Sequence, residues 1–428
     1  FFEHLSRDWP KRLTEKDLWK QLYHLPLQEF QNIKAKLKSR LLNFLRDYVR
    51  DHLLNVAHKR PELATVLSLL NERTILVTHA KRLATYKRAD LLIRNIERMK
   101  RLFPKDMAIL FIFAGKAHPS DGEGQDVLRR IMDYSRHPEL KGHILFIENY
   151  EIQIGRRLMA GSDLWLNTPL RPLEACGTSG MKAGINGTLN FSVADGWWPE
   201  AYNGRNGWMV GTPQELFDAE LQDLYDADQI FEIFEHEVFP LFRDHLKGGN
   251  GWAERIRESM ISLIPFVAAE RMMNEYDKTF YSPAIARANA LRSGNFQPLT
   301  SLIGMKDQLL KNWSRIQFAD AKVSGIFGPS LVRTKAFRLD VLLKHPDLPA
   351  EYLDVQALFH SQNSQRRTGT HHQSLELVEI GEGESHWRIK GANRPPGSYT
   401  LSVRVLPRVA SLNELEPLDL GLHLVKWL

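Results

Sequence analysis

The 428-residue sequence contains a single cysteine, Cys176, and has no uninterrupted apolar run long enough to cross a bilayer. One cysteine excludes an internal disulfide framework and is typical of proteins in a reducing compartment. The first residues, FFEHLSRDWPKRL, lack the basic start and apolar centre of a signal peptide. We therefore expect a cytoplasmic protein that does not enter a membrane, with Cys176 as a free thiol.

A strong charge imbalance is also missing. The 57 Lys and Arg residues face 51 Asp and Glu residues, which leaves a net charge of +6. Nucleic-acid-binding proteins usually concentrate such an excess on one element. The basic stretch at 32–54 has its apolar residues at helical spacing, so it is expected to be a packed amphipathic helix with a solvated polar face. We expect no nucleic-acid partner, and small anions such as phosphates fit the mild excess equally well.

An initial methionine is absent too, because the sequence begins at Phe1 within a helical pattern. We expect this sequence to be one piece of a longer protein. Its length suffices for two or three domains. Residues 1–70 are predicted to form helices that lead from a missing N-terminal domain.

Short apolar runs alternate with helical patterns in the next part of the chain. The runs are TILVTH at 74–79, MAILFIFAG at 107–115, HILFIE at 143–148, DLWLN at 163–167 and TLNFSV at 188–193. The helical patterns lie at 88–103, 124–140 and 151–161. Buried strands that alternate with helices predict right-handed crossovers and a doubly wound parallel sheet. The predicted fold class is α/β, with a Rossmann-like domain at 71–265.

The remainder of the chain is expected to hold two further parts. Residues 266–330 have a helical pattern, and residues 331–428 have short alternating runs split by Pro and Gly, which predict a small antiparallel, β-sandwich-like module. The polar segment at 360–374 is expected to be an exposed hairpin loop. Its His371 and His372 have no carboxylate or third histidine at ligand spacing, so no metal site is expected.

The stretch EACGTSGMKAGINGT at 174–188 gathers four glycines around Lys182. It follows the predicted strand at 163–167 and precedes a short helix. Ligands of doubly wound sheets bind where strand ends lead into helix N-termini. Small residues there allow backbone N–H groups to surround an anion, so the segment is a candidate phosphate site.

Three interpretations of this segment stay open from spacing alone. It could be a glycine-rich turn with a solvated Lys182. Ser179 and Lys182 could be the S-x-x-K pair of a serine acyl-enzyme, although no K-T-G partner follows. Lys182 could also carry pyridoxal phosphate through a Schiff base, because a lysine beside a phosphate cradle supplies both parts which that cofactor needs.

Several ordered motifs resemble those of one enzyme family. The segment EACGTSGMKAGINGTL is similar to the cofactor signature of the α-glucan phosphorylases, which comprise the glycogen, starch and maltodextrin phosphorylases. AKRLATYKRADLL at 80–92 resembles their basic phosphate-site motif, and FAGKAHP and LFIENYE occur in the expected order. DGWWPEAYNGRNGWMVG at 195–211 is most similar to the short bacterial and archaeal branch. The resemblance covers nearly the whole chain but only the C-terminal half of a phosphorylase, which has a two-domain glycosyltransferase B fold.

The resemblance implies a role for individual residues. Lys182 would carry pyridoxal phosphate, and Arg82 and Lys87 would hold inorganic phosphate as the other catalytic residues. The remaining cofactor contacts would be Lys81, Tyr150, Thr178, Ser179 and Gly180, and the sugar contacts would be Glu174, Cys176 and Gly177. Cys176 stands where many members have serine, and Glu151 stands where the animal enzymes have arginine.

The implied activity is reversible phosphorolysis of α-1,4-glucans to glucose 1-phosphate, by a glycosyltransferase that acts in glycogen and maltodextrin metabolism. The implied partners are the glucan, inorganic phosphate and glucose 1-phosphate, and a homo-oligomer is compatible with the resemblance. The isolated chain is expected to be inactive, because the other cleft wall would be missing.

Other functions also fit parts of the sequence. Asp195 and Glu200 could be the paired carboxylates of a glycoside hydrolase, but a hydrolase gives no reason for Lys182 and the basic motif. A nucleotide-sugar glucosyltransferase of the same architecture, and a noncatalytic glucan-binding fragment, are the alternatives that remain.

Overall fold

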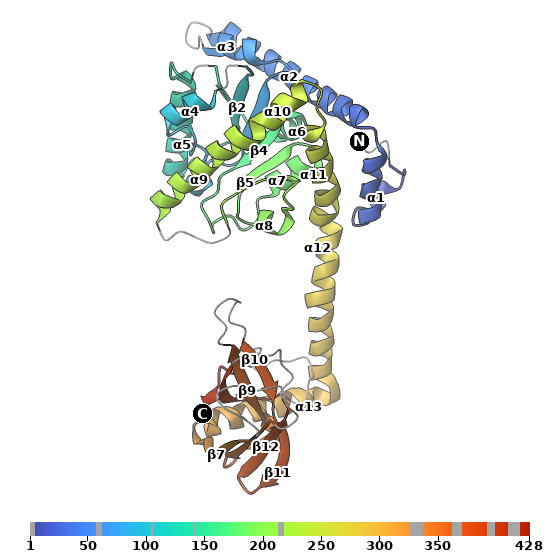
Figure 1. Cartoon of the computed structure of the whole chain (residues 1–428), viewed down its shortest axis with the longest axis vertical. Helices are drawn as coiled ribbons and strands as arrows, with labels where there is room; N and C mark the ends of the chain where they lie inside the picture. Colours follow the sequence, from blue (N-terminus) through green and yellow to red (C-terminus); the bar gives the residue numbers. More distant parts are fainter. Residues whose placement is uncertain are drawn as a thin grey trace. The chain divides into compact units, whose positions relative to one another are not determined.

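The computed structural model describes residues 5–56, 62–103, 106–140, 142–212, 218–324, 337–361, 370–391, 399–409 and 420–428. It divides into two compact units, Phe1–Glu275 and Tyr276–Leu428 (Figure 1). Within the described residues, no helix is both long and apolar enough to span a membrane.

The first unit is built on a six-stranded parallel sheet whose strand order is β3-β2-β1-β4-β5-β6. The strands are β1 (Ile75–Ala80), β2 (Ile109–Ala114), β3 (Ile144–Ile147), β4 (Leu164–Asn167), β5 (Leu189–Val193) and β6 (Gly207–Val210). Almost every strand residue is buried. This is the doubly wound arrangement, in which the chain winds outward in both directions from a switch point between β1 and β4. The predicted fold class is confirmed.

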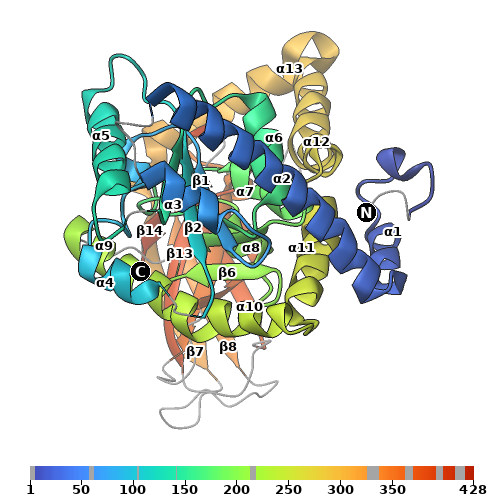
Figure 2. The same cartoon turned by 90° about the horizontal axis from the view of Figure 1, so that it is seen from above.

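Helices cover both faces of this sheet (Figures 1 and 2). On one face, α2, α3, α6 and α7 pack against residues such as Leu76 and Trp165. On the other face, α4, α5, α9, α10 and α11 pack against residues such as Val77 and Phe111. The helices of this unit are α1 (Lys16–Lys20), α2 (Leu27–Val56), α3 (Glu62–Leu69), α4 (Ile96–Leu102), α5 (Gly122–Arg136), α6 (Ile152–Gly161), α7 (Thr178–Ile185), α8 (Trp198–Ala201), α9 (Ala219–Ile233), α10 (Phe239–Leu246) and α11 (Gly251–Val267), with α12 (Ala269–Tyr276) running up to the division.

The second unit begins with a π-helical segment (Asp277–Tyr281) and α13 (Ser282–Asn312), which is kinked at residues 293–296. It continues as two four-stranded antiparallel sheets that share one hydrophobic core. The sheet orders are β10-β9-β13-β14 and β11-β12-β8-β7. The strands are β7 (Gln317–Ser324), β8 (Arg338–Lys344), β9 (Leu353–Ser361), β10 (Thr370–Ser374), β11 (Glu376–Gly381), β12 (Glu384–Lys390), β13 (Tyr399–Pro407) and β14 (Lys426–Trp427). Alternate residues of β8 are buried, as expected for a sheet with one face on a core.

Four local predictions differ from the structure. Strand β6 was not predicted, although its sequence lies within the 195–211 motif. Strand β7 lies in the segment 266–330, which was expected to be helical. The helical pattern at 88–103 becomes a helix only over α4, because Arg88 has a left-handed backbone conformation with φ of 42° and residues 89–94 form turns. His371 and His372 lie in strand β10, paired with β9, rather than in a loop. The middle of the predicted hairpin loop, 362–369, lies outside the described residues.

Candidate active site

Two loops meet at the carboxyl edge of the sheet, beside the switch point. One follows β1 and carries Lys81, Arg82 and Lys87; the other follows β4 and leads through Glu174 to the N-terminus of α7. They share a small cavity of about 30 Å³. Its lining residues are Lys81, Lys87, Asn167, Pro169, Glu174, Gly177, Ser179, Ser192, Asp195 and Trp197. Five residues predicted from the sequence are therefore gathered around one cavity, from segments almost 90 positions apart.

Lys81 lines this cavity. Its ammonium group donates to the side-chain oxygen of Asn167, whose amide nitrogen donates to Asn190 on β5 over 2.8 Å. Burial lowers the pKa of Lys81 to about 7, with the nearby charge of Lys87 acting in the same direction and Glu174 opposing it. A lysine with this pKa becomes fully protonated when an anion binds beside it, and this property suits a phosphate site.

Lys87 and Glu174 form an ion pair across the two loops. Both side chains are largely buried, with 12% and 15% of their surface exposed. The ammonium group of Lys87 also lies 4.8 Å from the ring centre of Tyr86. Arg82, by contrast, is exposed and does not line the cavity.

The glycine-rich stretch forms the first turns of α7. Gly177 is the N-cap residue, and no side chain described here caps that terminus, so the first backbone N–H groups have no side-chain acceptor. Gly180 packs closely on the sheet, because a Cβ atom there would come within 2.5 Å of the side-chain oxygen of Asn190. Thr178 and Lys182 are exposed, and the hydroxyl of Ser179 accepts a 3.2 Å hydrogen bond from the Trp165 indole.

Asp195 and Trp197 hold this stretch in place from the turn after β5. The carboxylate of Asp195 accepts the backbone N–H of Glu174 over 3.0 Å and that of Gly196 over 2.8 Å. The indole of Trp197 donates to the carbonyl of Gly177 over 3.0 Å. Asp195 therefore shapes the loop, which leaves it poorly suited to the hydrolase role. Sequence reasoning did not assign this loop-holding role, although the DGWW motif drew attention to both residues.

Tyr150 lies between β3 and α6, on the face of the sheet that α7 also covers. It packs at the margin of the core formed by α2, α3, α6 and α7, where burial raises the pKa of its phenol. A Cβ atom at Gly155 would lie 2.9 Å from the Tyr150 hydroxyl, so the glycine leaves room for the ring. Tyr150 and Cys176 are not among the residues that line the cavity, and Cys176 is an exposed free thiol.

His79 is a buried polar residue that sequence reasoning missed. It lies on β1 directly below the basic loop and is 2% exposed, with its ring centre 6.0 Å from that of Phe113. Neither ring nitrogen has a hydrogen-bond partner among the described residues. Burial and the charges of Lys81 and Lys87 hold the pKa of His79 well below its usual range, so its ring is neutral. A histidine inside the apolar run TILVTH was the signal that could have found it.

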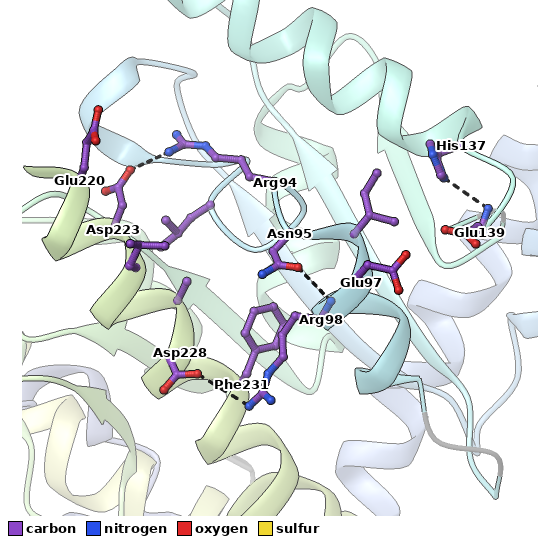
Figure 3. Close-up of a pocket in the computed structure, with 14 residues that line it drawn as sticks. Arg94, Asn95, Glu97, Arg98, His137, Glu139, Glu220, Asp223, Asp228 and Phe231 are labelled. Carbon is purple, nitrogen blue, oxygen red and sulfur yellow. Dashed lines mark hydrogen bonds and ion pairs between the residues drawn. The ribbon is translucent and has the colours of Figure 1, made fainter.

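A larger pocket of about 1000 Å³, which shares no lining residue with this cavity, lies between α4 and α9 (Figure 3). Its two arginines are already paired with acidic side chains: Arg94 with Asp223 over 2.6 Å, and Arg98 with Asp228 over 3.8 Å. The larger pocket is therefore not the better candidate for an anion-binding site, since the clustered cations line the smaller cavity.

One group of side chains in the described part of the chain has the spacing of metal ligands. It consists of Glu232, Glu235 and His236. Arg98 already lies 2.8 Å from Glu232 and 3.7 Å from Glu235, so these carboxylates are neutralised by an arginine. The group lends no support to a metal site.

A doubly wound sheet with lysines and a glycine-rich helix terminus at its switch point defines a protein that handles phosphorylated or anionic ligands. Comparison with known proteins narrows this class. A family model described as carbohydrate phosphorylase matches residues 10–202. The chain is thus similar to the carbohydrate phosphorylases, and the resemblance inferred from its motifs is confirmed.

Individual relatives extend this match. The chain is 34% identical over 315 residues to a maltodextrin phosphorylase of Thermococcus litoralis, covering 73% of this chain and 37% of the relative. It is 30% identical over 414 residues to a glycogen phosphorylase of Mycobacterium tuberculosis, covering 94% of this chain and 48% of the relative. A glycogen phosphorylase of Aquifex aeolicus is 36% identical over 283 residues, covering 65% and 40% respectively. The chain thus spans less than half the length of these relatives.

Proposed function

We propose that the complete protein containing this chain catalyses reversible phosphorolysis of α-1,4-glucans, releasing glucose 1-phosphate, with pyridoxal phosphate bound to Lys182. The observation that carries the proposal is the cavity at the switch point, where Lys81 and Lys87 meet Glu174, Gly177 and Ser179. The names of the relatives, maltodextrin phosphorylase and glycogen phosphorylase, support the same activity.

The basic loop would supply the charges for two phosphate groups. Like charges at contact distance repel strongly unless cations neutralise them, and this cavity has two lysines in its wall. Lys81 would face the cofactor phosphate, while Lys87 and the exposed Arg82 would hold inorganic phosphate. Arg82 offers a planar fork for phosphate oxygens, and Lys87 offers a point charge.

The glycine-rich stretch would hold the cofactor and the sugar. The backbone at the start of α7 suits an anion, with Thr178, Ser179 and Gly180 in its first turn and Lys182 one turn further along. Glu174 would accept a hydrogen bond from a glucose hydroxyl, beside the backbone of Cys176 and Gly177. Tyr150 would contact the cofactor ring.

The donor set of this site fits pyridoxal phosphate. The N-terminal amides of α7 lack a side-chain cap, Gly180 has no room for a Cβ atom, and an exposed lysine lies on the same helix. When bound there, pyridoxal phosphate would supply a phosphate group as an acid–base partner for the substrate phosphate. The protein's own residues then bind and orient: the lysines hold the phosphates together, and Asp195 and Trp197 keep the loop against them.

Reduction with borohydride, followed by peptide mass mapping, tests the cofactor assignment without relying on activity. We expect a pyridoxyl adduct on the peptide that contains Lys182, and none in a Lys182→Arg variant. A Lys116→Arg variant, altered at another exposed lysine, serves as the matched control and should keep the adduct. An adduct that is absent, or that lies on another lysine, would defeat the assignment.

A nucleotide-sugar glucosyltransferase and a noncatalytic glucan-binding protein are the competing functions. Release of glucose 1-phosphate from maltodextrin and phosphate supports the phosphorylase. Turnover with UDP-glucose or ADP-glucose, and none with phosphate, supports the transferase; glucan binding without turnover supports the third. The isolated 428-residue chain is expected to be inactive in each assay. A cytoplasmic location and a homo-oligomer stay predictions.

A further inference from the structure

One buried carboxylate on α9 contacts both loops of the candidate site from behind. Asp226 is completely buried. Its Oδ2 atom accepts a 2.6 Å hydrogen bond from Arg88, and its Oδ1 atom accepts one of 2.8 Å from Arg171. Gln222, one turn earlier on α9, donates to Oδ1 over 2.8 Å. A single carboxylate therefore bridges two buried arginines that belong to different loops.

Arg88 belongs to the basic loop and directly follows Lys87. Its Nε atom also donates to the carbonyl of Thr168 over 2.9 Å, and its Nη2 atom donates to the carbonyl of Pro169 over 2.7 Å. Its backbone is left-handed, with φ of 42° and ψ of 48°, which is uncommon for a side chain of this size. The hydrogen bonds of the buried guanidinium group hold Arg88 in this conformation. The conformation of Arg88 in turn sets the direction in which the neighbouring Lys87 extends from the turn.

Arg171 belongs to the other loop, three residues before Glu174. It is buried, and it donates to the carbonyl of Thr212 after β6 as well as to Asp226. Thr168, in the same loop, donates its hydroxyl hydrogen to the carbonyl of Lys87 or Arg88, at 3.0 Å and 3.1 Å. The two loops thus have a common anchor on α9, on the far side from the Lys87–Glu174 pair.

The outer end of this anchor reaches the protein surface. Asp223, one turn before Asp226 on α9, accepts a hydrogen bond from Arg88 over 2.7 Å. It also accepts one from Arg94 over 2.6 Å, and Figure 3 shows this contact. Arg94 in turn pairs with the buried Asp90 over 2.8 Å. Acidic and basic groups alternate along the chain of contacts, so each buried charge has a counter-charge.

We propose that Asp226 is a positioning residue for the phosphate site: through Arg88 and Arg171 it sets the spacing between Lys87 and Glu174. This inference rests on the proposed function, since it assigns those two residues to phosphate and sugar. Asp226 itself does not touch the site. It acts because a change of about 1 Å in the separation of two ligand-binding groups is enough to impair catalysis.

The test compares two buried carboxylates in the complete protein. Asp226→Asn removes the shared charge behind the site. Asp163→Asn is the matched control, because Asp163 forms a buried ion pair with Lys38 over 2.7 Å just before β4, at the amino edge of the sheet. The measurements are the KM values for phosphate and glucan, kcat, the pyridoxyl content, the melting temperature and the affinity for sulfate by calorimetry.

We expect Asp226→Asn to raise the KM for phosphate and weaken sulfate binding by about tenfold or more, with an unchanged pyridoxyl content. Asp163→Asn should lower the melting temperature at least as much, yet keep both phosphate parameters within about twofold. The inference is overturned if a folded Asp226→Asn variant keeps parental phosphate parameters, or if both variants weaken phosphate binding alike.

Two further comparisons test the role of Asp226 when the first variant or the proposed activity fails. If Asp226→Asn does not fold, Arg88→Lys keeps the charge but loses the planar fork that reaches the carbonyls of Thr168 and Pro169, and the same loss of sulfate affinity is expected. Parental affinity in that variant would count against the inference. If the parent protein shows no phosphorolysis, the proposed function fails, and the sulfate comparison alone decides the role of Asp226.

Discussion

The ammonium group of Lys87 is ion-paired with the carboxylate of Glu174, and the two side chains join the loops that follow β1 and β4. In the proposed reaction, Lys87 binds phosphate and Glu174 binds the sugar. Lys87 and Glu174 are therefore bound to each other until the substrates bind. Phosphate has to compete with Glu174 for Lys87, which makes the pair a determinant of anion affinity.

Glu174→Gln should tighten the binding of sulfate by about tenfold, which corresponds to ~1.4 kcal/mol, because Lys87 loses its competing counter-charge. The same change should lower kcat/KM for the glucan, since the proposed sugar contact loses its charge. The binding is best measured by calorimetry at pH 6, where Lys81 is charged. Glu200→Gln, at an exposed carboxylate of α8, is the control and should leave sulfate affinity unchanged. Equal or weaker sulfate binding in Glu174→Gln would contradict this account of the pair.

Lys81 predicts a specific pH dependence of anion binding. Its pKa of about 7 lies below the ordinary lysine value of 10.5, chiefly through burial. The charged form binds anions, so sulfate affinity should be constant below pH 7 and fall by up to tenfold per pH unit above it, with proton uptake on binding. Sulfate is the suitable probe because it does not titrate in this range.

Lys81→Met is the variant that tests this assignment. Sulfate should bind more weakly at pH 6, and the fall above pH 7 should disappear. The same lowered pKa makes the unfolded chain hold more protons than the folded one between pH 7 and 10.5, so Lys81 should make stability rise with pH across that window. A parental pH profile in Lys81→Met would show that another group is responsible.

Much of the fold was predictable because it depends on local patterns. Each strand of a doubly wound sheet is buried on both faces, so TILVTH and HILFIE stand out as short apolar runs. β6 was missed because its four residues, GWMV, follow a polar turn and are too few to show a pattern. The start of the helix predicted at 88–103 was wrong because tertiary contacts of the Arg88 guanidinium outweigh local helix propensity.

The site was predictable only in part, for a similar reason. Lysines and glycines after strand ends indicate an anion site, and the structure brings Lys81, Lys87, Glu174, Gly177 and Ser179 to one cavity. The hydrogen bonds of Asp195 and Asp226 join distant segments, and no spacing in the sequence encodes them. Asp226 is the clearest case, because in the sequence it is one of several acidic residues on an ordinary helix.

Gly180 should tolerate no side chain. A Cβ atom there would lie 2.5 Å from the side-chain oxygen of Asn190 and 3.0 Å from the amide nitrogen of Asn167. The side-chain oxygen of Asn167 accepts a hydrogen bond from Lys81. Gly180→Ala should therefore cost about 1–3 kcal/mol of stability through overpacking, and should weaken sulfate binding as Asn167 moves. Gly122→Ala, at the start of α5, is the control because its Cβ would meet nothing within 4 Å. Thermal unfolding and sulfate calorimetry on both variants check the prediction, and equal stability of the two would refute it.

The ion pair between Lys38 and Asp163 should matter for stability rather than for the site. Both side chains are more than nine-tenths buried, and Asp163 also accepts the backbone N–H of Leu76 over 2.8 Å. Lys38→Met should cost about 3–5 kcal/mol, since it leaves a buried carboxylate without its counter-charge.

The double variant Lys38→Met/Asp163→Asn removes both charges and keeps an amide oxygen for Leu76. It should recover a large part of that loss, because two desolvated charges are no longer present. Calorimetric unfolding of the two single variants and the double variant gives the coupling between the two positions. Additive losses would show that Lys38 and Asp163 stabilise the protein independently, contrary to the structure.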